Sequence, residues 1–193
     1  MQKDKEDLRI KRTRKYLCNA LFDLLQKNSF DKLSINDICN KAMVHRSTFY
    51  NHFTDKNDLL NYALDDIQEE MFEKTIKEGR HQSPKAILMS LISNTIDYIN
   101  ENHQKLVLIF ENSAEKMTTM IASSTKRSIS YLISKIEYPQ DCIIPKELVI
   151  SFYTGGITLV GIEWLKSKEP CNKDKALEYF NVLLDECIFI KNN

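Results

Sequence analysis

The stretch that decides the fold is residues 34–60, SINDICNKAMVHRSTFYNHFTDKNDLL. Ser34 suits the N-cap of a helix because its hydroxyl can accept a backbone N–H, and Asp37 places a negative charge in the first turn. Apolar residues then recur on one face at helical spacing, at Ile35, Ile38 and Ala42. We therefore predict a short helix that begins at Ser34 and ends near Met43.

A second short helix is predicted from about His45 to Phe53. Phe49 and Phe53 lie one turn apart and are expected to be buried. The other side chains can form hydrogen bonds on other surfaces: Arg46, Ser47, Thr48, Tyr50, Asn51 and His52. Such a helix can enter the major groove, where donors and acceptors contact base edges and phosphates. The pattern favours DNA binding over the alternative of a polar, solvated helix.

The same stretch resembles the DNA-binding domain of TetR/AcrR-type transcriptional regulators. That family has a helix opened by Thr or Ser, an Ala-Gly-Val turn, a recognition helix with Tyr-x-x-Phe, then Lys and an acidic-Leu pair. The elements appear here as Ser34, Ala42-Met43-Val44, Tyr50-Asn51-His52-Phe53, Lys56 and Asp58-Leu59-Leu60. Met43 replaces the usual glycine, so it must adopt a left-handed backbone or shift the turn. His45 replaces the usual capping Ser or Thr, which predicts a weaker cap.

The resemblance implies a set of DNA contacts. We expect base or phosphate contacts from the recognition helix, at Arg46, Ser47, Thr48, Tyr50, Asn51 and His52. We expect contacts to the DNA backbone from Ser34, Lys56, Arg12 and Arg14. Among these, Arg46 is the predicted guanine-binding residue, because a guanidinium can bond two acceptors of that base.

Composition favours an all-α fold. The chain has 193 residues, of which 42% are hydrophobic, but only four glycines and four prolines. It therefore lacks the turn residues that a sheet of many short strands needs. We predict about nine helices: a three-helix helix-turn-helix domain in residues 1–56 and a C-terminal helical bundle in residues 83–193. A fourth helix, about 55–79, links the two.

Positive charge is concentrated near the N-terminus. Residues 1–56 carry 12 Lys/Arg against 7 Asp/Glu, a balance of +5; the chain has 27 of each, so residues 57–193 hold 15 against 20, or −5. A compact run lies in or before the first predicted helix, about 8–27: Arg9, Lys11, Arg12, Arg14 and Lys15. A charge run can simply be a solvated face, but beside a helix-turn-helix it favours salt-dependent contact with phosphates.

Neither catalysis nor metal binding is indicated. The five cysteines, at positions 18, 39, 142, 171 and 187, form no C-x-x-C pair, and their odd number does not suggest a disulfide framework. Reduced thiols fit better, with Cys18, Cys39 and Cys187 on core faces. The histidines have no metal-binding spacing, and no phosphate-binding loop or nucleophile motif occurs. We expect no cofactor, no metal and no enzymatic activity.

A cytoplasmic location is expected. The chain opens with the charged MQKDKEDLRIKR, and no run of about 20 uninterrupted apolar residues occurs. We therefore predict neither a signal peptide nor a membrane-spanning helix. Lysine outnumbers arginine 21 to 6, which hints at an AT-rich bacterial genome.

The last two predicted helices, about 145–167 and 172–190, carry more apolar residues than one face can bury. Pairing with a second copy into a four-helix bundle would bury the excess, and the resemblance implies such a homodimer. The predicted interface residues are Phe152, Gly155, Gly156, Val160, Trp164, Phe180 and Leu184. Glycine costs about 1 kcal/mol inside a helix, so close crossing at the dimer axis is the preferred reason for Gly155, Gly156 and Gly161. A kink or a ligand-access gap is the alternative.

The resemblance also implies an effector pocket in the C-terminal bundle. Its candidate wall residues, each of which could equally be ordinary core, are Met71, Met89, Phe110, Met117, Met120 and Tyr131. Residues 152–165 loosely resemble a Gram-positive branch that includes the activator of dihydroxyacetone kinase genes. Members of that branch need not use a small molecule, so a protein co-regulator is the other candidate input.

The expected function is therefore a TetR-type repressor that binds double-stranded DNA at a palindromic operator as a homodimer and is released by an effector. The alternatives are an activator controlled by a protein partner and an architectural, chromosome-organising DNA-binding protein.

Overall fold

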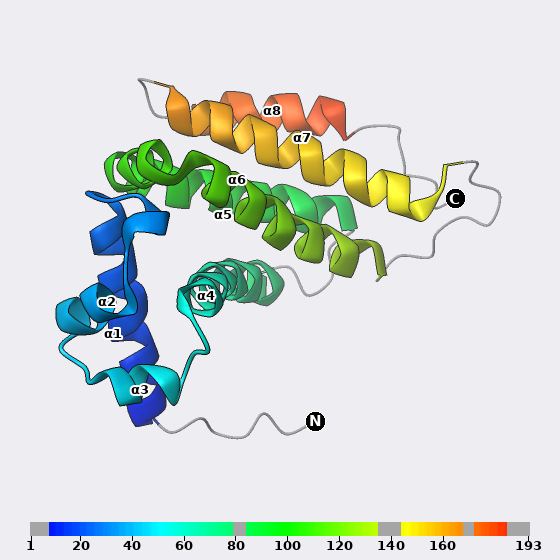
Figure 1. Cartoon of the computed structure of the whole chain (residues 1–193). Coiled ribbons are helices and arrows are strands. Elements are labelled where there is room, and N and C mark those ends of the chain that lie inside the picture. The colour runs from blue at the N-terminus through cyan, green and yellow to red at the C-terminus, as the bar shows by residue number, and fades with distance from the viewer. Residues whose placement is uncertain (1–7, 79–83, 135–143, 168–171, 185–193) are drawn as a thin grey trace. The chain divides into compact units, whose positions relative to one another are not determined.

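The computed structural model describes residues 8–78, 84–134, 144–167 and 172–184 (Figure 1). These residues form α-helices and one short 3₁₀ helix, without a strand, which confirms the all-α prediction. The elements are α1 Leu8–Leu25, η1 Phe30–Lys32, α2 Ile35–Ala42, α3 Arg46–Tyr50, α4 Lys56–Glu78, α5 Pro84–Glu101, α6 His103–Ser134, α7 Lys146–Lys166 and α8 Lys173–Leu183.

The described residues contain eight α-helices where about nine were predicted, and the difference lies in α6. The sequence predicts separate helices at about 103–112 and 114–136, whereas α6 runs through both. Ser113, with φ −149° and ψ 36°, is not helical and kinks α6 between the two predicted segments. The predicted break is therefore present as a kink inside one longer helix. The predicted linker beyond Glu78, the loop before Ile144 and the end of the last helix lie outside the described residues.

The chain divides into two compact units. The first unit is Met1–Asp66 together with Lys105–Met117, and the second is Ile67–Gln104 together with Thr118–Asn193. The division thus passes through α4 and α6, and a short piece of α6 groups with the N-terminal helices. The predicted domain limits, 1–56 and 83–193, remain a prediction.

The core of the first unit is made by apolar faces at helical spacing. Residues without any exposed surface come from four of its helices: Leu17, Leu21, Leu25, Ile38, Phe49, Leu59 and Leu60. α1 packs directly against α2, and α2 against α3. Cys18 and Cys39 are free thiols in this core, as predicted, and burial raises the pKa of Cys18 to about 12. Cys187 lies outside the described residues.

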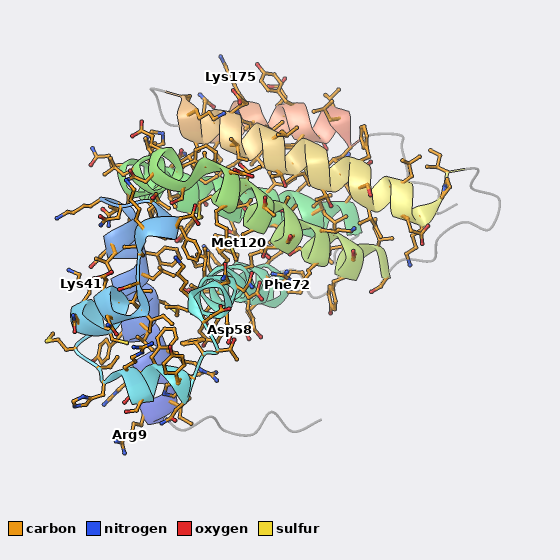
Figure 2. The ribbon with its side chains drawn as sticks, in the orientation of Figure 1. Arg9, Lys41, Asp58, Phe72, Met120 and Lys175 are labelled. Carbon is orange, nitrogen blue, oxygen red and sulfur yellow. The ribbon has the colours of Figure 1, made fainter. Side chains whose placement is uncertain are left out.

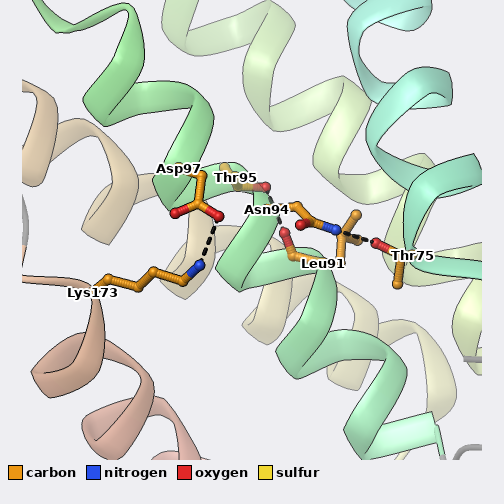
Figure 3. Close-up of polar contacts among 6 residues, drawn as sticks. All are labelled: Thr75, Leu91, Asn94, Thr95, Asp97 and Lys173. Atoms are coloured by element: carbon orange, nitrogen blue, oxygen red, sulfur yellow. Dashed lines mark hydrogen bonds and ion pairs between the residues drawn. The ribbon is translucent and has the colours of Figure 1, made fainter. Parts of the chain in front are cut away.

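The core of the second unit is formed by α5, α6, α7 and α8. Its buried residues are Leu88, Ile92, Ile96, Ile129, Leu132, Ile133, Val149, Tyr153, Ala176, Phe180 and Leu184. α4 adds Phe72, labelled in Figure 2, whose ring lies edge-on to Tyr131 at 5.1 Å. Polar contacts supplement this packing (Figure 3): Lys173 Nζ lies 2.6 Å from Asp97 Oδ2, and Asn94 Nδ2 donates to Thr75 Oγ1 at 2.8 Å.

α7 is long and apolar enough, by length and composition, to cross a membrane, although we predicted no membrane-spanning helix from the sequence. One of its faces is buried in the second unit through Val149, Tyr153 and Ile162. The opposite face carries exposed apolar side chains at Leu148, Phe152 and Leu159. A core helix that also offers a surface to a partner has this composition.

Candidate nucleic-acid interface

α2 precedes the candidate recognition helix, and reciprocal hydrogen bonds between Ser34 and Asp37 cap its start. The Ser34 hydroxyl accepts the Asp37 N–H at 3.2 Å, while Asp37 Oδ2 accepts the Ser34 N–H at 2.9 Å and the Ser34 hydroxyl at 2.6 Å. This capping box satisfies two N–H groups that a helix start leaves unpaired. It confirms the predicted N-cap. The contribution of Ser34 to DNA binding stays a prediction, since its hydroxyl is committed to the cap.

The turn between α2 and α3 is held by Met43 in the left-handed region, with φ 56° and ψ 42°. The Met43 N–H donates to Asn40 O at 3.2 Å, and the Val44 N–H to Cys39 O at 3.0 Å. These two bonds form a Schellman motif, which usually has glycine at the left-handed position. Met43 thus adopts the backbone conformation that glycine usually has in this turn, and that conformation is strained for a residue with a side chain. Met43 is 92% exposed, so packing of its side chain offsets little of this strain.

The candidate recognition helix α3 is shorter than predicted, Arg46–Tyr50 instead of about 45–53. His45 is its N-cap and makes no side-chain cap bond, as the substitution at this position predicted. A further turn follows, because Phe53 N–H donates to Phe49 O at 2.9 Å. Phe49 and Phe53 are both buried, which confirms the predicted inward face.

The outward face of α3 carries the predicted DNA-binding residues. Arg46, Ser47, Tyr50 and Asn51 are exposed, and Thr48 and His52 are half-buried. Arg46 Nη2 donates to the Tyr50 hydroxyl at 3.1 Å, and the guanidinium lies 5.5 Å from the centroid of the same ring. This hydrogen bond raises the pKa of Arg46 above its ordinary value. The two side chains therefore restrain each other on the exposed face, which reduces the entropy lost on binding.

A ladder of aromatic rings supports α3 from behind. The Phe49 and Phe53 centroids are 5.8 Å apart, and Phe53 lies 5.4 Å from Tyr62 of α4. Arg14 of α1 stacks on the other end of this ladder, with Cζ 5.0 Å from the Tyr62 centroid. Arg14 was predicted to contact phosphate. The structure gives it a half-buried, stacked position, whereas Arg12 is exposed and Arg9 points outward at the start of α1 (Figure 2).

Lys56, for which we predicted a contact with the DNA backbone, bonds to a loop of its own chain, and the DNA contact stays a prediction. Its ammonium donates to the carbonyls of Phe30 at 2.9 Å, Asp31 at 3.1 Å and Leu33 at 2.9 Å. An ammonium has three donors, and all three are used. The structure thus assigns Lys56 to holding the loop before α2, and a phosphate contact would require it to give up one of these bonds.

The start of α4 is capped by Asp55. Its Oδ1 accepts the N–H groups of Asn57 at 2.7 Å and Asp58 at 2.8 Å, and the bond from Asp58 is the main cause of a lowered Asp55 pKa. Asp58 in turn accepts the Thr54 N–H at 2.9 Å. The segment that leaves α3 is therefore fixed by hydrogen bonds rather than left as a free linker.

The predicted effector residues are not gathered into one site within either unit. Phe110 and Met117 belong to the first unit, while Met71, Met89, Met120 and Tyr131 belong to the second. Phe110, Met117 and Met120 are buried, and Tyr131 is exposed. Met89 borders an open depression of about 270 Å³, which is lined by Met89, Ser90, Ser93, Asn94 and Leu177. The effector pocket stays a prediction, and the group of acidic, His or Cys residues that a metal needs is absent from the described residues.

Sequence reasoning missed three side chains that support the interface from α6: Asn112, Ser113 and Lys116. Asn112 and Ser113 bond to the backbone of α1 and η1, and Lys116 bonds to Asn57. These partners lie more than fifty positions away in the sequence, so periodicity could not reveal them. The one available signal was the predicted helix break between residues 112 and 114.

Replacing Met43 with glycine should stabilise the protein. A left-handed L-residue costs about 1–2 kcal/mol, and the extra unfolded-state entropy of glycine offsets about 0.5–1 kcal/mol of the gain. We expect Met43→Gly to raise the free energy of unfolding in urea. The matched control is Asn40→Gly, also exposed in α2 but helical, which should lower it by about 0.3 kcal/mol, because asparagine is itself a poor helix former. Equal losses in both variants would show that the turn carries no strain.

The α2 cap should weaken in acid. The pKa of Asp37 is lowered, first by the hydrogen bond from the Ser34 hydroxyl and then by the Ser34 N–H. Since its folded pKa lies below the unfolded value of about 4, the contribution is complete above that pH and is lost as pH falls through the folded pKa. We expect the stability difference between wild type and Asp37→Asn to shrink below about pH 4 in urea denaturation. A pH-independent difference would contradict the assignment.

Comparison with known proteins supports this geometry. Residues 17–63 match the model of bacterial regulatory proteins of the tetR family. The chain is 30% identical over 112 residues to the HTH-type dhaKLM operon transcriptional activator DhaS of Lactococcus lactis subsp. lactis (strain IL1403), covering 54% of this chain and 60% of DhaS. It is 32% identical over 105 residues to the uncharacterized HTH-type transcriptional regulator YxbF of Bacillus subtilis (strain 168), covering 48% of this chain and 27% of YxbF. The matches thus span less than two thirds of either relative.

Solved structures share the fold over most of the chain. The dihydroxyacetone kinase operon activator DhaS aligns with a TM-score of 0.56 and 21% identity, covering 89% of this chain and 93% of that one. A TetR transcriptional regulator from Streptococcus agalactiae 2603V aligns with a TM-score of 0.59 and 22% identity, covering 92% and 96%. Residues 17–63 thus match the tetR family of bacterial regulatory proteins, and the chain shares the fold of these two solved structures over most of its length.

Proposed function

We propose that this protein is a transcriptional regulator that binds a palindromic DNA operator as a homodimer, with α3 in the major groove. The observation that carries the proposal is the exposed polar face of α3, held from behind by buried Phe49 and oriented by the Arg46–Tyr50 pair. Paired heads on successive half-sites would stand about 34–36 Å apart, one turn of DNA. The basic residues of α1 supply phosphate contacts beside it.

Dimerisation through α7 and α8 is the second part of the proposal. Large apolar side chains are exposed on α7 at Leu148, Phe152 and Leu159, and on α8 at Tyr179, Val182 and Leu183. Phe152, the most exposed of them, has 73% of its surface free. Large exposed apolar side chains on two neighbouring helices in the sequence are typical of a subunit interface.

Burial within one chain divides the predicted interface residues into two groups. Phe152 is exposed as expected, but Phe180 and Leu184 are buried in the core of their own subunit. Val160 and Trp164 pack against that core, with the Trp164 and Phe180 rings 5.7 Å apart. These four residues face inward because α7 and α8 turn one apolar side toward α5 and α6. The other side, which sequence alone could not distinguish, is left for a partner.

The sign of regulation is proposed as repression with release by an effector, which follows the sequence-based prediction. One observation favours the second candidate, an activator that works with a protein partner: DhaS, to which the chain is similar, is an operon activator. A reporter driven by the bound promoter, with the gene for this protein present or deleted, separates the two signs. Repression predicts higher reporter output on deletion, and activation predicts lower output.

DNA binding is tested with a duplex selected from a random pool by the purified protein, compared with a scrambled duplex. Arg46→Ala should weaken binding and relax preference at one base pair by about 1–3 kcal/mol. Tyr50→Ala should weaken binding to all sequences similarly. Lys41→Ala, which removes an exposed cation from α2, is the charge-matched control and should leave base preference unchanged. Equal loss on selected and scrambled duplexes for Arg46→Ala would exclude it as a base-contacting residue.

Wild-type indifference between the two duplexes would instead favour an architectural DNA-binding protein. Mapping the bound sites across a genome then counts them: few sites near promoters support a regulator, and many scattered sites support the architectural alternative.

Gly156 provides the test of the dimer. It is exposed on the same side of α7 as Phe152, and an added Cβ would meet no described atom within 4 Å. Gly156→Ala should therefore stabilise the helix by about 1 kcal/mol yet weaken dimerisation if α7 crosses its copy closely there. Gly161→Ala, on the half-buried side, is the control and should change stability alone. Sedimentation equilibrium measures the dimer, and a Gly156→Ala dimer as strong as wild type would refute close crossing at this residue.

A further inference from the structure

Phe30 of η1 contacts two α-helices of the first unit, α4 and α6. It is buried, with 3% of its surface exposed, and lies in η1 between α1 and α2. Its N–H donates to Ser113 Oγ of α6 at 2.8 Å, and its carbonyl accepts from Lys56 Nζ of α4 at 2.9 Å. The ammonium groups of Lys56 and Lys116 lie 4.7 and 5.3 Å from its ring centroid. One residue therefore receives hydrogen bonds or cation–π contacts from both α4 and α6.

The neighbours of Ser113 extend this junction along α6. Asn112 Nδ2 donates to the carbonyls of Leu25 at 3.2 Å and Gln26 at 3.1 Å, which lie at the end of α1 and lack helical partners. Lys116 Nζ donates to Asn57 Oδ1, in the first turn of α4, at 2.6 Å. Successive side chains of α6 thus hold the end of α1, the η1 loop and the start of α4.

The kink in α6 coincides with this contact. Ser113 is the residue at which α6 leaves helical geometry, and its hydroxyl is the partner of the Phe30 N–H. A serine inside a regular helix commonly bonds to the carbonyl four residues earlier. Here the hydroxyl serves a buried N–H that would otherwise be unsatisfied, which is costly.

We propose that Lys105–Met117 of α6 is a built-in part of the DNA-binding head and that Ser113 and Lys116 are positioning residues that couple α3 to the rest of α6. This deepens the proposed function and rests on it. α6 continues after Met117 into the second unit. A change in the backbone angle at the Ser113 kink therefore alters the hydrogen bond and the cation–π contact that α6 makes with Phe30.

The physical route is short. Withdrawal of Ser113 and Lys116 leaves the Phe30 N–H unpaired and frees Asn57. The loop that contains Phe30 is then less fixed, so the carbonyl groups that bind Lys56 can move. Lys56 is the first residue of α4, the helix that directly follows α3. Coupling between two binding or conformational events is reciprocal, so DNA on α3 must also influence α6 beyond the kink.

The reciprocal effect gives a test that needs no effector. Amide hydrogen exchange is measured on the full-length protein, free and bound to the duplex selected by the wild type. The test variant is Ser113→Ala with Lys116→Met. The matched control is Ser123→Ala with Lys126→Met, the same substitutions at the same spacing on exposed positions of α6.

In wild type and control, the selected duplex should slow exchange in both α3 and residues 118–134. In the test variant, α3 should still respond while residues 118–134 do not. Affinity for the duplex should fall about tenfold, the size of effect that one lost buried hydrogen bond can have. The salt dependence should stay unchanged, because Lys116 neutralises no phosphate. Ser113→Thr with Lys116 retained should restore the response, and Lys116→Met alone replaces the double variant if that variant does not fold.

A wild-type protein whose residues 118–134 ignore the duplex would overturn the coupling, as would a response that survives in the test variant. A salt slope reduced by about one in Lys116→Met would make Lys116 a phosphate contact and overturn its positioning role. Failure of the proposed function gives a different result. No duplex would then slow amide exchange in α3 of the wild type, and the proposed coupling would be refuted together with the proposed function.

Discussion

The ammonium of Lys56 joins the end of the helix-turn-helix to its beginning. It lies at the start of α4, after α3, yet it binds three carbonyls of the loop that precedes α2. Both ends of the α2–turn–α3 segment are therefore tied to one point. This constraint lets α3, the proposed recognition helix of five residues, keep a fixed orientation, although a helix of that length has no stability of its own.

Local strain and local caps complete the arrangement. The capping box of Ser34 and Asp37 fixes where α2 begins, and the left-handed backbone of Met43 fixes how it ends. Phe49 and Phe53 then anchor the inner side of α3 in the core, so that Arg46 and Tyr50 can stay on the surface and restrain each other. The exposed groups of α3 are thus pre-organised by buried neighbours, which lowers the entropic cost of binding a duplex.

The second unit distributes its apolar residues over two surfaces of α7 and α8. One surface packs Val149, Tyr153 and Phe180 into the core, and the other exposes Phe152, Leu159 and Val182. The excess of apolar residues was evident from the sequence, but its division was not. Helical periodicity shows that two faces exist, whereas only the positions of α5 and α6 decide which face is buried.

The sequence by itself determined the all-α fold, the cap at Ser34 and the polar face of α3, because each depends on residues within a few positions of one another. It placed a turn at Met43 but left open whether that residue is left-handed, which the structure decided. It also located the break in α6 near residue 113. The tertiary structure decided the positions of Lys56, Arg14, Phe180 and Leu184, because their neighbours come from distant parts of the chain. The Phe30 junction is the clearest case: Ser113 and Phe30 are 83 positions apart, and nothing in the local pattern of either residue specifies the other.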